Sequence, residues 1–182
     1  MEQIQTLQHA VLAYFDDNTN KIINNFIKEI AVATGNRFML DNNLPPHMTM
    51  GIMLSENLNG DFDSLNNYLK ELNHKKVDIM FRSIGIFLPT TLYLGPILDN
   101  NLIELNKKIQ LLIRRAGGQI DAQYSFDTWQ PHATLAMSLT DEELEKALHI
   151  IDKTKIEFSG KIEKLALTHC CPLQEISVYD LK

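Results

Sequence analysis

The chain has few cysteines, few prolines and no long apolar run, and each shortage narrows what the protein can be. Its 6 prolines and 8 glycines are scattered along 182 residues, so no flexible linker is expected to divide the chain. No apolar stretch approaches the roughly 18 residues that a membrane span needs. The 2 cysteines, Cys170 and Cys171, are adjacent and have no other partner. We therefore expect two reduced thiols, as is usual in the cytosol.

A basic excess and a signal sequence are also missing. The N-terminal residues do not show a basic segment followed by an apolar one, so we expect a cytoplasmic protein. The formal net charge is −6 and the pI is about 5.5. Long nonspecific contacts along a nucleic-acid backbone depend on lysine and arginine, and they are not expected here. One phosphate, or one RNA end, held in a local groove remains compatible with this charge.

Strand and helix patterns alternate throughout the sequence. Apolar or alternating runs predict strands at residues 7–15, 48–54, 77–87, 91–94, 133–139, 156–168 and 174–181. Helical spacing predicts helices at residues 16–35, 62–72, 102–116 and 140–151. Neighbouring strand pairs are frequent, which favours antiparallel or mixed sheets. The succession of predicted strands and helices in the first half is roughly repeated in the second half. We therefore expect a single bilobal domain over residues 1–182 with an internal pseudo-two-fold symmetry.

One short motif, Pro-His-x-Thr-apolar, occurs twice, at residues 46–50 and 131–135. Each copy opens a predicted strand. Successive side chains on a strand point to opposite faces, so the histidine and the threonine of each copy share a face about 6.6 Å apart. A leading proline suits the first residue of a strand because it has no N–H to donate. The two copies can therefore bring two imidazoles and two hydroxyls into one groove.

That set of side chains suits acid–base chemistry on a phosphate ester. Imidazole titrates near neutral pH, so His47 and His132 can serve as one proton donor and one proton acceptor. The hydroxyls of Thr49 and Thr134 can donate hydrogen bonds to non-bridging phosphate oxygens, where charge builds in the transition state. The alternative is that all four are ordinary strand residues. The repetition in matching context favours the catalytic interpretation.

With these residues the chain resembles the 2H phosphoesterase superfamily, and especially its bacterial branch of 2′-5′ RNA ligases and RNA 2′,3′-cyclic phosphodiesterases. The resemblance rests on both motifs (47–50 and 132–135) and, more weakly, on residues 91–96. It implies an α/β (α+β) bilobal fold in which two pseudo-symmetric mixed or antiparallel sheets line a central groove, with helices outside. Met50 departs mildly from the family pattern, because many members have leucine or isoleucine there.

The resemblance also implies an activity. A 2′,3′-cyclic phosphate on an RNA end or a small cyclic nucleotide would be opened without metal or cofactor, with His47 as the acid and His132 as the base. Thr49 and Thr134 would hold the phosphate. One alternative is reversible 2′-5′ ligation or cleavage. The other is a nucleotide- or RNA-end-binding module with little turnover. We expect a monomer.

Two aromatic residues and one basic helix face are secondary candidates. Tyr93 and Trp129 could stack on a base, or they could pack in the core or at its rim. Four cations on one predicted helix could meet RNA phosphates or form a solvated face: Lys107, Lys108, Arg114 and Arg115. A zinc site at residues 169–171 is not expected, because adjacent strand residues point in opposite directions and no second cluster completes it.

Overall fold

A computed structural model describes residues 8–53, 62–152, 156–170 and 172–182. Its strands are β1 (Gln8–Phe15), β2 (His47–Met53), β3 (Val77–Phe87), β4 (Thr91–Pro96), β5 (Ala133–Ala136), β6 (Phe158–Cys170) and β7 (Gln174–Asp180). Its helices are α1 (Asp17–Thr34), α2 (Phe38–Asp41), α3 (Phe62–Glu71), α4 (Asn100–Arg115), α5 (Asp141–Asp152) and the short 3-10 helix η2 (Ala122–Tyr124). The alternation predicted from the sequence is therefore confirmed over the described ranges.

All seven strands belong to one antiparallel sheet with the order β1-β2-β5-β4-β3-β6-β7. β1 also pairs with β6, so the six strands from β1 to β6 close on themselves. The long strand β6 makes this closure, because its first residues pair with β3 and the rest pair with β1 and β7. The expected mixed α/β class is confirmed. The strands expected to form two sheets are joined into one at the β2–β5 and β3–β6 pairings.

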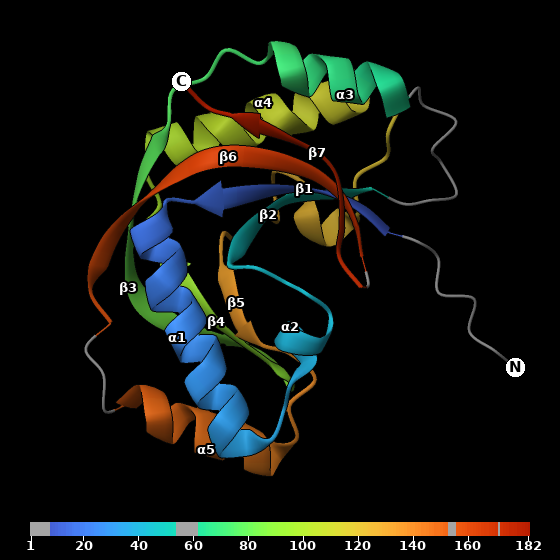
Figure 1. The fold of residues 1–182 in the computed structure, drawn as a ribbon. Helices are drawn as coiled ribbons and strands as arrows, with labels where there is room; N and C mark the ends of the chain where they lie inside the picture. Colours follow the sequence, from blue (N-terminus) through green and yellow to red (C-terminus); the bar gives the residue numbers. More distant parts are fainter. Residues whose placement is uncertain (1–7, 54–61, 153–155, 171) are drawn as a thin grey trace, which may run out of the picture.

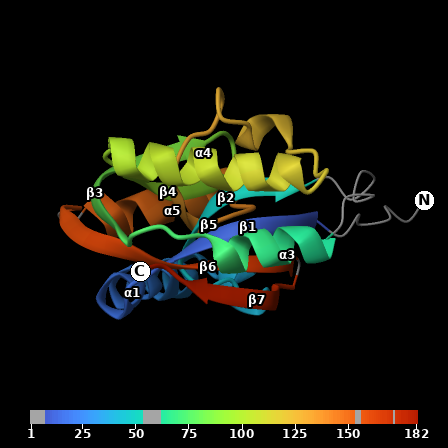
Figure 2. The ribbon, with the colours of Figure 1, turned by 90° about the horizontal axis from the view of Figure 1, so that it is seen from above.

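Helices cover both sides of this curved sheet. Figure 1 shows α3 and α4 together on one side and α1, α2 and α5 on the other. The view from above in Figure 2 shows α3 and α4 lying along the strands. Buried apolar residues from the strands and from these helices form the hydrophobic core. Among the described residues, no helix is both long enough and apolar enough to cross a bilayer.

The ends of the longest helix follow from its sequence. Asp16 caps α1 by accepting a hydrogen bond from the Thr19 backbone N–H at 3.0 Å. Gly35 ends the helix with φ of 83°, a left-handed conformation that glycine adopts without steric cost. Between these caps, apolar residues at helical spacing, among them Ile23 and Ile27, are buried. Local sequence signals thus account for α1 from start to end.

The structure departs from the predicted elements at β5 and α2. The strand predicted for residues 133–139 ends at Ala136, because Ser138 has φ of 57° and turns the backbone. Leu139 then donates its N–H to the Thr90 carbonyl at 3.1 Å instead of continuing the strand. The short helix α2 was not predicted, since four residues are too few to show a helical period. Residues 7 and 54, at the ends of two predicted strands, lie outside the described ranges.

The prediction about the cysteines also needs a correction. Cys170, the last residue of β6, is disulfide-bonded, so the expectation of a reduced thiol there is wrong. That expectation rested on the cellular compartment, which does not determine the state of one particular pair. Cys171 lies outside the described residues.

Candidate active site

The two motif strands are direct neighbours in the sheet. Met48, the middle residue of the first His-x-Thr motif, pairs with Ala133, the middle residue of the second, and β2 and β5 run antiparallel. An antiparallel register about this pair places the histidine of each motif beside the threonine of the other. The site therefore has a local two-fold relationship between two strand segments that are 85 residues apart in sequence.

The alternation of side chains within each motif is as predicted. His47, Thr49, His132 and Thr134 all line one cavity. The two middle residues point to the other face of the sheet, where both are fully buried in the core. A shift of one residue in either strand would exchange these faces. The sheet register therefore places the histidine and threonine of each motif, rather than the apolar residue between them, in the lining of the cavity.

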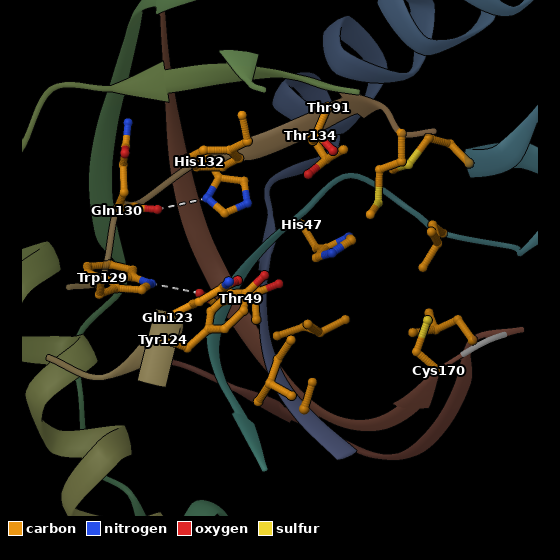
Figure 3. A pocket seen from close by; sticks show the side chains of 18 of the residues that line it. His47, Thr49, Thr91, Gln123, Tyr124, Trp129, Gln130, His132, Thr134 and Cys170 are labelled. Atoms are coloured by element: carbon orange, nitrogen blue, oxygen red, sulfur yellow. Dashed lines mark hydrogen bonds between the residues drawn. The ribbon is translucent and has the colours of Figure 1, made fainter. Parts of the chain in front are cut away.

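The cavity has a volume of about 860 Å³, which is within the range of small-molecule sites. Figure 3 shows the imidazoles of His47 and His132 near its middle, pointing toward one another. Thr91 and Thr134 lie together on one side of this pair, and Thr49 lies on the other side together with Gln123 and Tyr124 (Figure 3). A small ligand between the imidazoles would thus meet hydroxyl groups on both sides.

Both imidazoles are held in the same way. Nδ1 of His47 lies 2.7 Å from the carbonyl oxygen of Pro45, and Nδ1 of His132 lies 2.7 Å from the carbonyl oxygen of Gln130. A carbonyl can only accept, so these contacts require the proton on Nδ1. Nε2 of each ring is then free to give or take a proton in the cavity. In both cases the carbonyl belongs to the residue two positions before the histidine, so the residue directly before each motif orients its imidazole.

Burial lowers the pKa of both imidazoles. Desolvation lowers the pKa of His47 from its ordinary value, the Pro45 carbonyl partly opposes this, and the nearby imidazole of His132 lowers the pKa further. Desolvation also lowers the pKa of His132, and the Gln130 carbonyl partly opposes it. Each ring therefore tends to be neutral in the empty site. Because two neighbouring imidazolium ions repel each other, the pair favours at most one extra proton.

Aromatic side chains from the β3–β4 hairpin support His132. The Phe87 ring meets it edge-to-face at 4.8 Å between centroids, and the Tyr93 ring lies 5.3 Å away. Phe87 and Tyr93 stack on each other at 4.3 Å. The Gln130 side-chain amide donates to the Tyr93 hydroxyl. Tyr93 is packed against Gly85, where a Cβ atom would overlap its ring. The imidazole therefore rests on a packed aromatic support.

The two aromatic candidates differ in their position. Trp129 lines the cavity, and its indole Nε1–H donates to the Thr49 carbonyl at 2.9 Å. Tyr93 is buried and does not line the cavity. Stacking of a base on Tyr93 thus has no support in the geometry, which places Tyr93 behind His132. Stacking on Trp129 stays a prediction, and its hydrogen bond to β2 gives this residue a structural role that the sequence did not indicate.

Several further lining residues were not predicted. They are Thr91, Gln123, Tyr124 and Gln130. Two of them had a signal in the sequence: Thr91 opens the segment 91–96 on which the family resemblance weakly rests, and Gln130 directly precedes the second motif. Burial, and to a lesser degree Asp121, raises the pKa of the Tyr124 hydroxyl, so this group stays protonated and can donate. The buried amide of Gln110 in α4 anchors the loop by donating to the Tyr124 carbonyl at 2.8 Å.

The basic helix face does not reach the cavity. None of its four cations lines it: Lys107, Lys108, Arg114 and Arg115. Lys108 forms an ion pair with Glu104 on the same helix, and Arg115 lies over the Tyr68 ring of α3. The solvated or packed interpretation of this face is therefore better supported than contact with RNA. In the described part of the chain, histidine, cysteine and acidic residues form no group of three or more that could hold a metal ion.

Comparison with known proteins identifies the family of this chain. Residues 21–169 match the model of the 2′-5′ RNA ligase superfamily. The chain belongs to this superfamily. The resemblance to 2H phosphoesterases, drawn from the two motifs, is thereby confirmed. Membership in the superfamily supports a phosphodiesterase- or ligase-type activity. No curated protein has a sequence that matches this chain.

Solved structures of other proteins share the fold. A protein described as a phosphoesterase has a TM-score of 0.67 at 14% identity, over 98% of this chain and 99% of its own. LigT of E. coli, in complex with 3′-AMP, has a TM-score of 0.67 at 12% identity, over 97% and 98% of the two chains. TT0787 of Thermus thermophilus has a TM-score of 0.66 at 11% identity, over 96% and 97%. At these identities the likeness is one of fold.

Proposed function

We propose that this protein is a phosphodiesterase that opens 2′,3′-cyclic phosphates by two-histidine acid–base catalysis without metal. One observation carries the proposal: two imidazoles point toward one another across one cavity, each with Nδ1 on a backbone carbonyl and Nε2 free. A phosphorus atom between them would have a base on one side and an acid on the other. In phosphoryl transfer the attacking and leaving oxygens lie on opposite sides of phosphorus, so a base and an acid on opposite sides suit the reaction.

In the proposed reaction, water attacks phosphorus and His132 accepts its proton at Nε2. The bond from phosphorus to one ribose oxygen breaks, and protonated His47 gives its Nε2 proton to that oxygen. The product is a ribose phosphate monoester with a free neighbouring hydroxyl. The assignment of acid and base follows the superfamily resemblance. The two rings are held in nearly the same way, so they can exchange the roles of acid and base when the reaction runs in reverse.

The threonines complete the proposed mechanism. Thr49 and Thr134 lie beside the two histidines and would donate hydrogen bonds to the non-bridging oxygens. Fixed donors of this kind stabilise charge that develops in the transition state. Two imidazoles and two hydroxyls supply acid, base and electrostatic support, so a metal ion is not needed for any of these tasks. The LigT structures with 3′-AMP and with phosphate support a nucleotide or phosphate ligand at a site of this fold.

A second candidate is the reversible joining or cleavage of a 2′-5′ linkage. The description of the matching family favours it, since the superfamily takes its name from 2′-5′ RNA ligase. The same two histidines would serve, with a ribose hydroxyl in place of the attacking water. The two candidates differ in the nucleophile alone, so product analysis separates them.

The purified protein should be incubated in excess EDTA with nucleoside 2′,3′-cyclic phosphates, a cyclic-ended oligonucleotide and a 2′-5′-linked dinucleotide. Hydrolysis of a cyclic phosphate that persists in EDTA supports the proposal. Release of nucleosides from the 2′-5′ dinucleotide with no opening of the cyclic phosphates would favour the second candidate. Activity that disappears in EDTA and returns with Mg²⁺, Mn²⁺ or Zn²⁺ would overturn the mechanism.

A further inference from the structure

Among the described residues that line the cavity, the two histidines are the only side chains that can carry a positive charge near neutral pH. No lysine, arginine, aspartate or glutamate is among the described residues that line it. Of the residues outside the described ranges, only Lys153 and Lys155 are cationic. The chain nevertheless has 17 lysines and arginines, so the absence of cations from the described lining is a property of the site rather than of the composition.

Two cations close to segments that line the cavity already have partners. Arg37 precedes the lining residue Phe38, and its Nε lies 3.1 Å from Asp41 Oδ1. Lys107 reaches the loop that contributes Gln123 and Tyr124, and its Nζ lies 4.4 Å above the centre of the Phe126 ring. Both side chains are thus engaged outside the cavity, and neither is placed to pair with an anion inside it.

Apolar side chains form one part of the cavity lining. They come from α2, from the segment after α2, from the end of β5 and from the β6–β7 turn: Phe38, Met39, Leu44, Met137 and Leu173. The N–H of Leu173 donates to the Asn42 carbonyl at 2.9 Å, which holds the β6–β7 turn against the α2 segment. This set is called the apolar wall below.

We propose that the site takes small cyclic phosphodiesters with a single negative charge, whose uncharged body lies against the apolar wall, in preference to RNA ends or nucleotides with further phosphates. This inference rests on the proposed function and names its substrate class. One phosphodiester charge is met by the hydroxyls of Thr49 and Thr134 and by a protonated imidazole. A second phosphate inside the cavity would be desolvated without a cation, which is unfavourable.

The volume of the site agrees with this class. A cavity of about 860 Å³ can enclose a whole drug-sized ligand, so a cyclic mononucleotide fits without leaving the site. An RNA chain would have to extend past the rim. Phosphates there would gain little, because exposed charge pairs are weak and screened by salt, and the protein as a whole is acidic. An additional phosphate is therefore not expected to increase affinity, either inside the cavity or at its rim.

The first experiment compares matched substrates with the wild-type protein. They are adenosine 2′,3′-cyclic phosphate, the same compound with a 5′-phosphate, and a short oligonucleotide with a cyclic end. We expect kcat/KM to be at least tenfold lower for the 5′-phosphorylated compound and for the oligonucleotide. Raising the salt concentration should change kcat/KM for the mononucleotide little. Equal or higher kcat/KM with the additional phosphates would overturn the inference and leave the proposed function standing.

The second experiment places a cation in the lining. Leu173→Lys should raise kcat/KM for the 5′-phosphorylated compound relative to the unphosphorylated one by several-fold or more. Leu173→Gln, the uncharged control of similar length, should leave this ratio unchanged. Gln123→Lys, at another position of the lining, keeps the test valid if the first variant does not fold. If neither folded lysine variant changes the ratio, a missing cation does not explain the preference, and the inference fails.

A binding measurement separates this inference from the proposed function. Calorimetry on the His132→Ala variant measures the affinity for the same two mononucleotides without turnover. The inference is supported if the variant binds the cyclic nucleotide without a 5′-phosphate at least tenfold more tightly than the same compound with one. This holds even if the wild type hydrolyses neither compound. Absence of hydrolysis would contradict the proposed function alone. Tighter binding of the 5′-phosphorylated compound would overturn the inference whatever the wild type hydrolyses.

Discussion

Trp129 donates its indole N–H to the backbone carbonyl of Thr49 at 2.9 Å, across 80 positions of the sequence. The bond joins the loop before the second motif to the strand that carries the first motif. Thr49 is only 8% exposed, so little water can replace the donor if the indole is removed. The relative position of the two motifs therefore depends on this side chain as well as on the pairing of β2 with β5.

Replacing Trp129 by phenylalanine separates this structural role from base stacking. Phe keeps an aromatic face but leaves a buried carbonyl without its donor, which costs about 1–3 kcal/mol. We expect Trp129→Phe to lower the free energy of unfolding in urea by that amount and to lower kcat/KM about tenfold. A variant with full stability and full activity would show that the aromatic face alone matters, as stacking requires.

The proposed role of the two cavity histidines can be tested by their removal. We expect His47→Ala and His132→Ala each to lower kcat by a factor on the order of 10² to 10⁴, the usual contribution of general acid–base catalysis. His149, on α5 away from the cavity lining, is the matched control, and His149→Ala should leave kcat unchanged. Steady-state rates with a cyclic mononucleotide measure the effect. Near-wild-type turnover by either cavity variant would exclude that histidine from the reaction.

The threonine hydroxyls can be removed without loss of side-chain shape. Thr49→Val and Thr134→Val keep a β-branched side chain suited to a strand but remove a donor. We expect a loss on the order of 10² to 10³ in kcat, as for oxyanion-hole donors. Thr→Ser at the same positions keeps the hydroxyl and should be better tolerated. Circular dichroism checks that all four variants fold. Valine variants as active as the serine variants would make the threonines purely structural.

The pH profile should be bell-shaped and displaced to acidic pH. Burial lowers the pKa of both His47 and His132, so the base becomes neutral below the ordinary imidazole pKa of about 6.5, and the acid loses its proton at lower pH too. We expect kcat/KM to be highest below about pH 6.5. In kcat the profile should move to higher pH, because a bound anionic phosphate favours imidazolium. A rate that only declines as pH rises would indicate one protonated imidazole rather than an acid–base pair.

The aromatic support of His132 can be disturbed from a distance. A Cβ at Gly85 would overlap the Tyr93 ring, which packs beside His132. We expect Gly85→Ala to cost about 1–3 kcal/mol of stability and to lower kcat with little change in KM. Gly95→Ala, in the same hairpin, is the control, because its Cβ would come closest to the rotatable Ser83 hydroxyl. Equal kinetics of the two variants would mean that Tyr93 does not position the imidazole.

Local signals in the sequence account for most elements of the fold. A capping box begins α5: Thr140 N–H donates to Glu143 Oε2 at 2.7 Å, and Glu143 N–H donates to Thr140 Oγ1 at 3.3 Å. Caps and hydrophobic periods involve residues a few positions apart, so they can be read without knowing the fold. The short helix α2 and the early end of β5 were not readable, because each depends on a few residues whose partners lie elsewhere.

The repeated motif in the sequence was enough to predict which polar side chains share the cavity, because strand alternation places a histidine and a threonine of each motif on one face. Only the tertiary structure decided that Met48 pairs with Ala133, that Trp129 joins the two motifs, and that Tyr93 lies behind an imidazole. It also decided that the cavity lining has no lysine or arginine among the described residues. The physical reason is distance along the chain: the walls come from segments far apart in sequence, and their contacts follow from the closure of the sheet rather than from any local pattern.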